Sequence, residues 1–414
     1  MIVDQLKKHG RGEQVEPDLT GPLDTEVLTG VREFAALEEE WGELWAASPA
    51  ATPFQSWAWL FSWWENYGGG RLSLRLVAAR EGRGGALVGL APLMVERGFG
   101  PLPGRLLFLG SGEANYLDVI ARAGFEEQVA GVMAEELRSM LGHGGIIDFG
   151  DLRSSATTWK LYRDWRGPKS SVPQAGCPVI DLGDGGWDGI LSSLSKNRRS
   201  TVRRALRQAK ADGVRGELAD AGEAEAAARR LVALHRESWQ GRDIAAEHLS
   251  ERWASLMVTA GKRMTERGLG AVSELWRGDE LLASHLLVFG HDFVGFLTIG
   301  ASKEAMNDYQ FSSLLIWDGV CRALDRGIPC FDMMQGEEAY KIHWCTSVAP
   351  KHRVIMARSV ASWLPYAGYY VLGSRIVRYA KRRVKSEETP RWIEAAAKSV
   401  VRGYRILRRT TRRT

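Results

Sequence analysis

The fold of this chain is decided by residues His291–Trp344, HDFVGFLTIGASKEAMNDYQFSSLLIWDGVCRALDRGIPCFDMMQGEEAYKIHW. Residues Phe293–Thr298 are apolar on both faces of an extended backbone, which predicts a buried strand. An amphipathic helix follows and ends at Gly327, a residue type that commonly terminates helices, and Pro329 blocks its continuation. The apolar face of this helix is formed by Leu314, Trp317, Cys321 and Leu324.

A second short strand is predicted at Cys330–Met334, so the start of the helix should lie beside the ends of two strands. Backbone N–H groups at a helix start are unsatisfied and carry a partial positive charge, which favours phosphate or carboxylate. We therefore expect Gln310, Ser312 and Ser313 to hold the phosphates of a ligand.

Several segments resemble one bacterial family. The pattern IGAS…FSSLLIWDGVCRALDRG…FDMMQGEEAYKIHW is similar to the C-terminal half of the double-domain GNAT acyltransferases. SLSKNRRSTVRRALRQAKADG resembles the basic helix that opens their second domain, and LVGLAPLMVER and LLFLGSGEANYLDVIA resemble parts of the first. The chain thus resembles the CelD-like group, which is associated with cellulose or exopolysaccharide biosynthesis and is related to the Fem aminoacyl-transferases. The resemblance covers roughly residues 30–358.

The resemblance implies an α/β fold of two tandem GNAT-like domains with mixed central sheets, followed by a basic helical tail. We expect a flexible lead-in at residues 1–26, a first domain at 27–177, a second domain with the donor site at 178–360, and the tail at 361–414. The implied activity is acyl transfer from acetyl-CoA or another acyl-CoA. The acceptor would be an amine or hydroxyl of a small molecule or glycan, such as a sugar, a polysaccharide precursor or an envelope metabolite.

The start of the helix departs from the family pattern. GNAT enzymes place a glycine-rich turn there, whereas Asp308–Ser313 contains no glycine, which makes close approach of a pyrophosphate harder. Two alternatives therefore stand beside an acyl-CoA transferase. One is a Fem-like transferase that uses aminoacyl-tRNA, and the other is a non-catalytic, membrane-associated scaffold with a degenerate acyltransferase fold.

The resemblance makes Tyr340 and Lys341 candidates for catalysis. A tyrosine can protonate a leaving thiolate, because both groups have pKa values above neutrality, and a lysine can stabilise an oxyanion. A tyrosine packed against the sheet beside a surface lysine explains the pair equally well. Asp332 lies in an otherwise apolar strand. It is either paired, with Lys341 or an arginine, or a general base with a raised pKa, and the paired role is favoured.

A helix predicted over Trp187–Ala211 carries a stripe of cations on one side. The stripe is either a solvated face or a strip that binds phosphate or carboxylate groups, and its uncompensated charge favours binding. Arg199 and Arg203 are therefore candidates for binding the donor. The whole stripe consists of Lys196, Arg199, Arg203, Arg207 and Lys210.

The first domain offers candidate residues for the acceptor. The predicted helix Phe54–Tyr67 is unusually aromatic, and Trp59 is a candidate for stacking on a sugar, although packing between the two halves is the favoured explanation. Asn115, Tyr116 and Asp118 follow a Gly-Ser-Gly turn and match the first-domain motif of the family, which makes them candidate polar groups of the acceptor site.

Composition narrows the setting. A chain of 414 residues with 45% hydrophobic and 25% charged residues predicts a globular protein of two domains with an appendage. The N-terminus shows no signal peptide, and four cysteines without CxxC spacing predict free thiols, so we expect a cytoplasmic protein. The histidines show no metal-ligand spacing, so no metal is expected, and His285 is expected to be a hydrogen-bonded core residue.

The positive charge is concentrated at the C-terminus. Residues 371–414 hold fourteen Lys or Arg against three Glu, a net charge of +11, which leaves the other residues at −6. Two basic amphipathic patterns in this tail favour an anionic membrane surface, on the inner face of the plasma membrane, as a partner. tRNA, a partner protein and a disordered basic extension are the alternatives.

Overall fold

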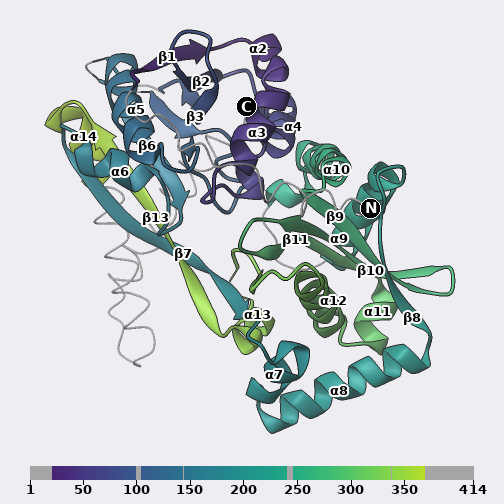
Figure 1. The fold of residues 1–414 in the computed structure, drawn as a ribbon. Helices are drawn as coiled ribbons and strands as arrows, with labels where there is room; N and C mark the ends of the chain where they lie inside the picture. Colours follow the sequence, from purple (N-terminus) through teal and green to yellow (C-terminus); the bar gives the residue numbers. More distant parts are fainter. Residues whose placement is uncertain (1–20, 99–103, 143, 240–245, 337, 369–414) are drawn as a thin grey trace, which may run out of the picture.

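The computed structural model describes residues 21–98, 104–142, 144–239, 246–336 and 338–368. Within these residues the protein is an α/β fold whose strands form one mixed sheet in the order β1-β2-β3-β4-β6-β13-β7-β12-β11-β10-β9-β8, with β5 paired to β3 (Figure 1). The expected α/β class with a mixed sheet is therefore confirmed.

The strands divide into two sets, with β7 and β13 between them. Those of the first half are β1 (Leu23–Leu28), β2 (Leu72–Glu81), β3 (Leu87–Glu96), β4 (Arg105–Phe108), β5 (Ile120–Ala121) and β6 (Ile146–Leu152). Those of the second half are β8 (Val214–Leu218), β9 (Gly270–Arg277), β10 (Glu280–Phe289), β11 (Val294–Ala301) and β12 (Cys330–Asp332). The connecting strands are β7 (Lys169–Asp181) and β13 (Ser347–Ala357).

The helices divide in the same way. The first half contains α2 (Val31–Ala36), α3 (Glu38–Ala46), α4 (Trp57–Tyr67), α5 (Glu126–Met140), α6 (Thr158–Asp164) and a 3-10 turn at Pro53–Gln55. The second half contains α7 (Gly186–Ser193), α8 (Lys196–Ala211), α9 (Ala224–Ser238), α10 (Glu251–Glu266), α11 (Lys303–Asp308), α12 (Phe311–Asp325), α13 (Ala339–Trp344) and a 3-10 turn at Ala246–Leu249. The last described helix is α14 (Val360–Ala367).

The two halves repeat one order of elements. In the first, β1 and helices precede the antiparallel strands β2, β3 and β4, and α5 then crosses to the parallel strand β6. In the second, β8 and helices precede β9, β10 and β11, and α12 then crosses to the parallel strand β12. This repetition agrees with the expected duplicated fold, although no repeat is visible between the residues themselves.

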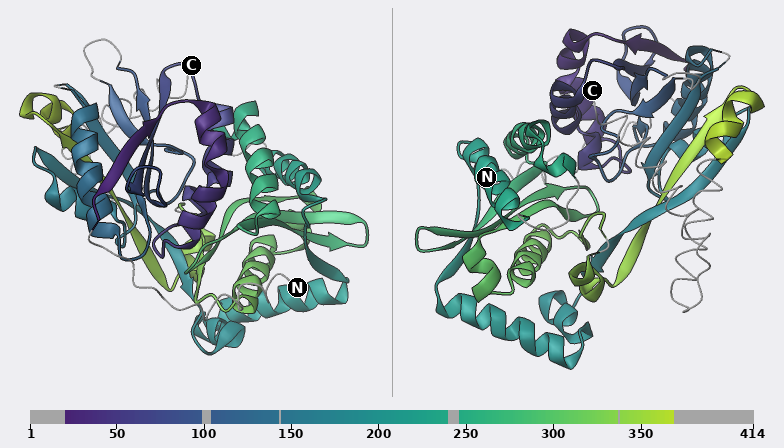
Figure 2. Two further views of the ribbon diagram at one scale, coloured as in Figure 1. Left: turned by 45° about the horizontal axis from the view of Figure 1, so that its top comes forward. Right: turned by 180° about the vertical axis from the view of Figure 1, so that it is seen from behind.

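The last strand of each half pairs with the other half. Strand β7 pairs with β12, β13 pairs with β6, and the two long strands pair with each other (Figures 1 and 2). The boundary expected between residues 177 and 178 lies inside β7. Because each half completes the sheet of the other, the halves form one continuous sheet rather than two independent ones.

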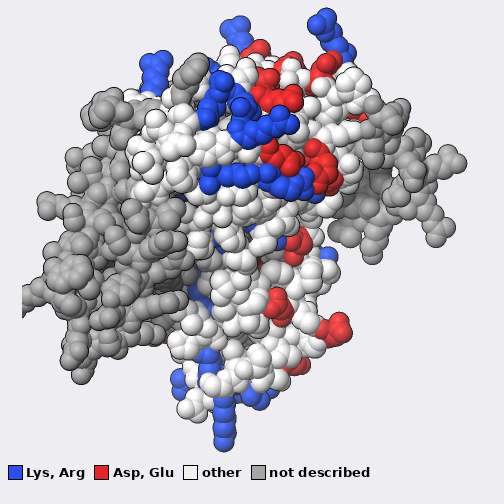
Figure 3. Space-filling model, turned by 90° about the vertical axis from the view of Figure 1, so that its left-hand side faces the viewer, with Lys and Arg blue, Asp and Glu red and all other residues white. Residues whose placement is uncertain are grey.

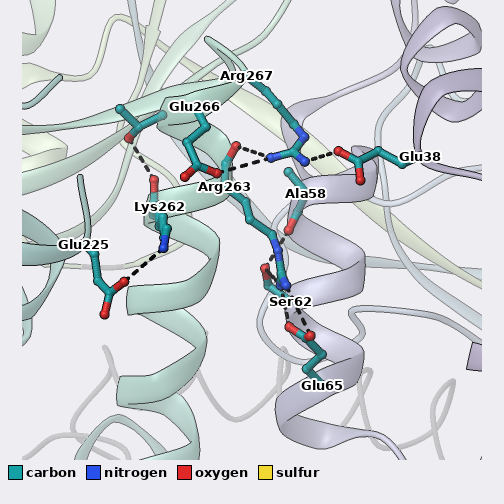
Figure 4. A network of polar contacts seen from close by, with 11 residues as sticks. Glu38, Ala58, Ser62, Glu65, Glu225, Lys262, Arg263, Glu266 and Arg267 are labelled. Atoms are coloured by element: carbon teal, nitrogen blue, oxygen red, sulfur yellow. Dashed lines mark hydrogen bonds and ion pairs between the residues drawn. The ribbon is translucent and has the colours of Figure 1, made fainter. Parts of the chain in front are cut away.

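Helices α4 and α10 form a second contact between the halves (Figure 4). Arg263 pairs with Glu65, donates to Ser62 Oγ at 2.9 Å and lies 5.1 Å from the ring centre of Phe61. One helical turn further on, Arg267 pairs with Glu38. The aromatic helix α4 therefore packs between the two halves. This agrees with the packing role that the sequence favoured for its aromatic residues over stacking on a sugar.

Most predicted elements are confirmed, and the exceptions have local causes. The helix expected over 187–211 is two helices, because the chain is extended at Leu194 and Ser195. The sequence also predicts a strand over residues 116–120, of which the structure forms only β5 at its end. Strand β1 begins at Leu23, so the lead-in expected for residues 1–26 is too long. Strand β13 was not predicted, since its polar first half hides the period of a strand.

The core is continuous through the first half and the helices between the halves, with separate clusters beneath α12 and α14. His285 is buried and its Nε2 lies 2.9 Å from Asp318 Oδ2, which confirms the expected hydrogen-bonded core histidine. All four cysteines are free. None of the helices in the described ranges has the length and apolarity that a membrane span requires. The basic tail from residue 369 onward lies outside the described residues.

Candidate active site at the junction of the two halves

Asp332 lies at the end of β12 and is held by groups from both halves. Its Oδ2 accepts a hydrogen bond from the Tyr116 hydroxyl at 2.5 Å, and its Oδ1 accepts one from the Met334 N–H at 2.7 Å. The side chain is buried, with 2% of its surface exposed. Burial raises the pKa of Asp332 above its usual value, and the two hydrogen bonds offset this only in part. Asp332 is thus paired with a tyrosine, not with Lys341 or an arginine as expected.

Asn115 provides a second link between the halves. Its Oδ1 accepts a hydrogen bond from the Gln335 N–H at 3.0 Å and lies 3.9 Å from Cys177 Sγ. Burial raises the pKa of the Cys177 thiol to about 12, so this cysteine is a packing group rather than a nucleophile. Asn115 and Tyr116, predicted for the acceptor, therefore lie beside Asp332, predicted for catalysis.

A buried lysine adds a positive charge to the same cluster. Lys351, on β13, donates to Asp151 Oδ1 and to Gln335 Oε1, both at 2.8 Å, and its side chain has 0% exposure. Asp151 lies near the end of β6 and has a φ of 61°. Met334 lies just after β12 and has a φ of 55°. Among the described residues these two are the only non-glycine residues with positive φ. Strained backbone of this kind concentrates at functional sites.

Lys341 reaches the cluster from α13. Its Nζ donates to Gln335 O at 3.1 Å, lies 3.2 Å from Glu338 Oε2 and sits 5.4 Å from the ring centre of Phe296. Lys341 is buried, so it is not the surface lysine of the alternative explanation. Tyr340 instead packs half-buried against the apolar core beneath α12, where burial and Glu338 raise its pKa.

Arg153 covers the Tyr116 side of the cluster. Its guanidinium carbon lies 5.2 Å from the ring centre of Tyr116 and 5.5 Å from that of Phe293. Asp292 holds it there through hydrogen bonds of 2.5 and 3.1 Å. This cation balances part of the negative charge around Asp332.

Strands β11 and β12 diverge at the cluster. They pair only at Val294–Phe331 and Gly295–Asp332, after which β12 ends and β11 continues to Ala301. In the part of the chain that the structure describes, residues 296–301 have no strand partner on the β12 side. An unpaired strand edge presents N–H and C=O groups to an extended ligand.

Helix α12 begins beyond the far end of this open edge. Gln310 is the N-cap, is exposed, and makes no side-chain capping bond. Ser312 is half-buried at the second helical position, whereas Ser313 is buried and its N–H already donates to Gln310 O at 2.8 Å. Of the three residues predicted for donor binding here, Gln310 and Ser312 are therefore the more available.

The two arginines predicted for donor binding lie on α8. The Arg199 guanidinium donates to Ser192 O and Leu194 O, both at 3.1 Å, and so closes the end of α7. Arg203 is exposed on the outer face of α8. In the described part of the chain, neither side chain forms a hydrogen bond or an ion pair with the residues around Asp332.

Asp118 and Trp59, which the sequence predicted for the acceptor, are buried and contact other parts of the first half. Asp118 is buried and accepts hydrogen bonds from Thr157 N at 2.5 Å and Thr158 N at 2.8 Å, which holds the start of α6. Trp59 is fully buried and packs edge-on against Phe54. A role for Trp59 in stacking on a sugar is not compatible with this position.

The sequence did not point to Asp151, Arg153, Gln335 or Lys351. Lys351 lies in the unpredicted strand β13, and its two partners come from segments 200 and 16 residues away along the chain. The available signal was one lysine in the segment SVAPKHRVIMA, whose polar first half hides the period of a strand. The described residues also contain no group of three or more side chains suited to holding a metal ion.

Comparisons with known proteins bear on the fold and on the second half of the chain. Residues 196–342, from α8 to α13, match the family model "Acetyltransferase (GNAT) domain". The crystal structure of FemX is 13% identical, covers 80% of this chain and 96% of its own, and superposes with a TM-score of 0.52. A conserved protein of unknown function from Bacteroides thetaiotaomicron is 10% identical, covers 77% of this chain and 97% of its own, and has a TM-score of 0.51.

Among curated proteins there is no significant match. The two structural likenesses concern the fold, and the family match concerns the second half, which carries Asp332 and Lys341. Residues 196–342 are therefore similar to a GNAT acetyltransferase domain, within an overall fold of the kind seen in FemX.

Proposed function

We propose that this protein transfers an acyl group from acyl-CoA to an amine or hydroxyl of a sugar, a polysaccharide precursor or an envelope metabolite. The observation that carries the proposal is Asp332, a buried carboxylate with a raised pKa, bonded to Tyr116 of the other half where β11 and β12 diverge. A carboxylate with a raised pKa is a suitable general base near neutral pH.

The open edge of β11 suits the arm of the donor. Residues 296–301 span roughly 20 Å at about 3.3 Å per residue, between the Asp332 cluster and the start of α12. An extended arm with amide groups can pair with this edge. Its phosphates would then lie near Gln310 and Ser312, and its thioester near Asp332.

The proposed chemistry is direct transfer. The acceptor nitrogen or oxygen attacks the thioester carbonyl, the C–S bond breaks, and the proton of the acceptor passes to Asp332. Lys341 would stabilise the oxyanion, because a buried ammonium is a strong electrostatic partner. Tyr340 is the proposed proton donor to the thiolate, and its raised pKa keeps the hydroxyl protonated between turnovers. Asn115 and Tyr116 would face the acceptor.

A second candidate is transfer from aminoacyl-tRNA. The start of α12 has no glycine, and the cations of α8 have no recorded ion pairs in the described part of the chain. Both features would suit a donor with a nucleic-acid handle rather than CoA. Salt-sensitive tRNA binding without acetyl-CoA binding would favour this candidate.

The test is calorimetric titration of the full chain with acetyl-CoA. We expect saturable binding that Ser312→Asp weakens at least about tenfold, because a carboxylate at the helix start repels the phosphates of the ligand. The matched control is Ala226→Asp, which places the same charge in the exposed first turn of α9. It should change the affinity less than about twofold.

Three outcomes distinguish the candidates. Binding that responds to Ser312→Asp but not to Ala226→Asp supports an acyl-CoA donor at α12. Equal effects of both substitutions would overturn the proposed phosphate site. Absence of stabilisation by acetyl-CoA, longer acyl-CoAs and tRNA in thermal melts would favour a scaffold without catalysis.

A further inference from the structure

Helix α8 carries an uninterrupted basic surface. Its 16 residues, KNRRSTVRRALRQAKA, contain seven Lys or Arg and no Asp or Glu. Val202, Ala205 and Ala209 are buried on the inner side, and the helix contacts α12 and β8. The exposed side carries one row of cations within about 60° around the helix axis and along about 21 Å of its length. The row consists of Lys196, Arg203, Arg207 and Lys210.

Among the described residues these cations have no acidic partner at ion-pair distance. The next two helices along the chain, α9 and α10, follow the usual pattern, since Arg229 pairs with Glu225 and Arg236 pairs with Glu251. No ion pair is recorded for any Lys or Arg of α8 within the described ranges. A surface helix that serves only solubility normally mixes charges of both signs. The row therefore matches an anionic partner better than water alone.

The row lies at one end of the molecule. Figures 1 and 2 show α8 along the outer edge of the second half, with α7 and α13 at its start. In the side view of Figure 3, blue Lys and Arg side chains predominate at the same lower end, whereas blue and red alternate at the upper end. A flat anionic surface can approach α8 from outside without meeting the rest of the sheet.

Two exposed apolar side chains lie next in the chain to a segment that faces the turn between α7 and α8. A hollow of about 310 Å³ is lined on one side by residues 193–195 and Arg198 and on the other by residues 343–346. The end of α13 therefore faces the turn between α7 and α8. Ile342 and Val348 flank that segment of 343–346, and 62% and 57% of their surfaces are exposed. Exposed aliphatic side chains next to cations are the usual composition of a membrane-contacting surface.

We propose that α8, together with the exposed Ile342 of α13 and Val348 of β13, docks this protein onto an anionic phospholipid surface. The cations of the row would lie at the headgroup phosphates, and the two aliphatic side chains would enter the interfacial region. The exposed side of α8 carries no aromatic ring on which a nucleic-acid base can stack, which disfavours single-stranded RNA as the partner. This docking is independent of the proposed acyl transfer.

The test is co-sedimentation of the full chain with vesicles of phosphatidylcholine alone and with about one third phosphatidylglycerol. Each Lys or Arg near an anionic bilayer strengthens binding by about fivefold. Reversing two charges of the row, with Lys196→Glu and Arg207→Glu, should therefore weaken binding to the anionic vesicles at least about twentyfold. The substitution at Lys196 introduces an acidic residue into the first turn of α8, which the helix dipole favours.

The control has the same change in charge at another place. Arg32→Glu with Arg83→Glu alters two exposed residues of the first half without recorded ion pairs, and it should weaken binding less than about threefold. All variants keep residues 369–414, so a contribution of the basic tail is common to them. In a second variant, Ile342→Ser with Val348→Ser should weaken binding measurably without altering the net charge.

Three results would overturn the proposal. The first is equal binding of wild type to both kinds of vesicle. The second is an equal effect of the α8 variant and its control, which would assign the binding to overall charge or to the tail. The third is loss of binding to a fluorescent RNA duplex in the α8 variant while its vesicle binding is unchanged, which would identify nucleic acid as the partner. Melting curves of each variant exclude unfolding as the cause.

Discussion

The side chain of Asp332 shows how far a local pattern reaches. A carboxylate in an apolar strand indicates either a paired group or a general base with a raised pKa, and Asp332 is both hydrogen-bonded and raised in its pKa. The partner could not be predicted, since Tyr116 lies 216 residues away in the chain. The tertiary pairing of β12 with β7, β7 with β13 and β13 with β6 helps to bring the two segments together.

Replacing Asp332 by Asn should reveal the energetic penalty of this buried charge. A carboxyl group whose pKa is raised by folding stabilises the protein fully below its unfolded pKa of about 4, and this contribution is lost as pH rises through the folded pKa. Between those values the wild type should lose stability relative to Asp332→Asn by up to about 1.4 kcal/mol per pH unit. Urea denaturation at several pH values between 4 and 8 measures this difference.

Asp325→Asn is the matched control, since Asp325 is exposed on α12. Its stability difference from wild type should be small and independent of pH. A constant difference for Asp332→Asn as well would show that burial does not raise the pKa of Asp332. A variant that gains stability at pH 8 and loses acyl transfer would have the signature of a functional residue.

Among the elements, β11, α12 and β12 are the part of the fold that the sequence predicted best. Their apolar periods, the left-handed Gly327 with φ of 65° and the following proline are all local signals. The divergence of β11 and β12, which begins after the pair Gly295–Asp332, was not predicted. A Cβ at Gly295 would lie 2.0 Å from Met334 Cε and 3.0 Å from Asp332 O.

Gly295→Ala should therefore destabilise the protein by about 1–3 kcal/mol, since the added methyl group must displace the buried Met334. The control is Gly131→Ala on the exposed side of α5, where no atom lies within 4 Å of the added Cβ. That substitution should stabilise the protein by about 0.5–1 kcal/mol. The free energy of unfolding in urea measures both, and an unchanged value for Gly295→Ala would show that Met334 can move without loss.

Over the whole molecule, the two halves are joined in two ways. Strands β7 and β13 complete the sheet, each pairing with the other half, and α4 packs against α10. The candidate active site depends on both contacts, because it draws Tyr116 from one half and Asp332 from the other. A shift between the halves would separate these two side chains.

Arg263 is the side chain that tests the contact between α4 and α10. Arg263→Ala removes its pair with Glu65 and its contact with the ring of Phe61, and should lower the free energy of unfolding by about 2 kcal/mol. Arg229→Ala, which breaks an exposed pair within α9, should lower it by less than about 0.5 kcal/mol. Equal effects of the two substitutions would mean that the contact between the halves contributes no more than a surface ion pair.

The amino-acid sequence was sufficient for the α/β class and for most helices and strands, whereas the duplicated fold was implied by the family resemblance. The helices and strands depend on hydrophobic period, capping and turn residues, which act over a few neighbouring positions. The exchange of β7 and β13, the buried Lys351 and the pairing of Tyr116 with Asp332 required the three-dimensional structure. They join residues far apart in the chain, and no local pattern records which distant group will neutralise a buried charge.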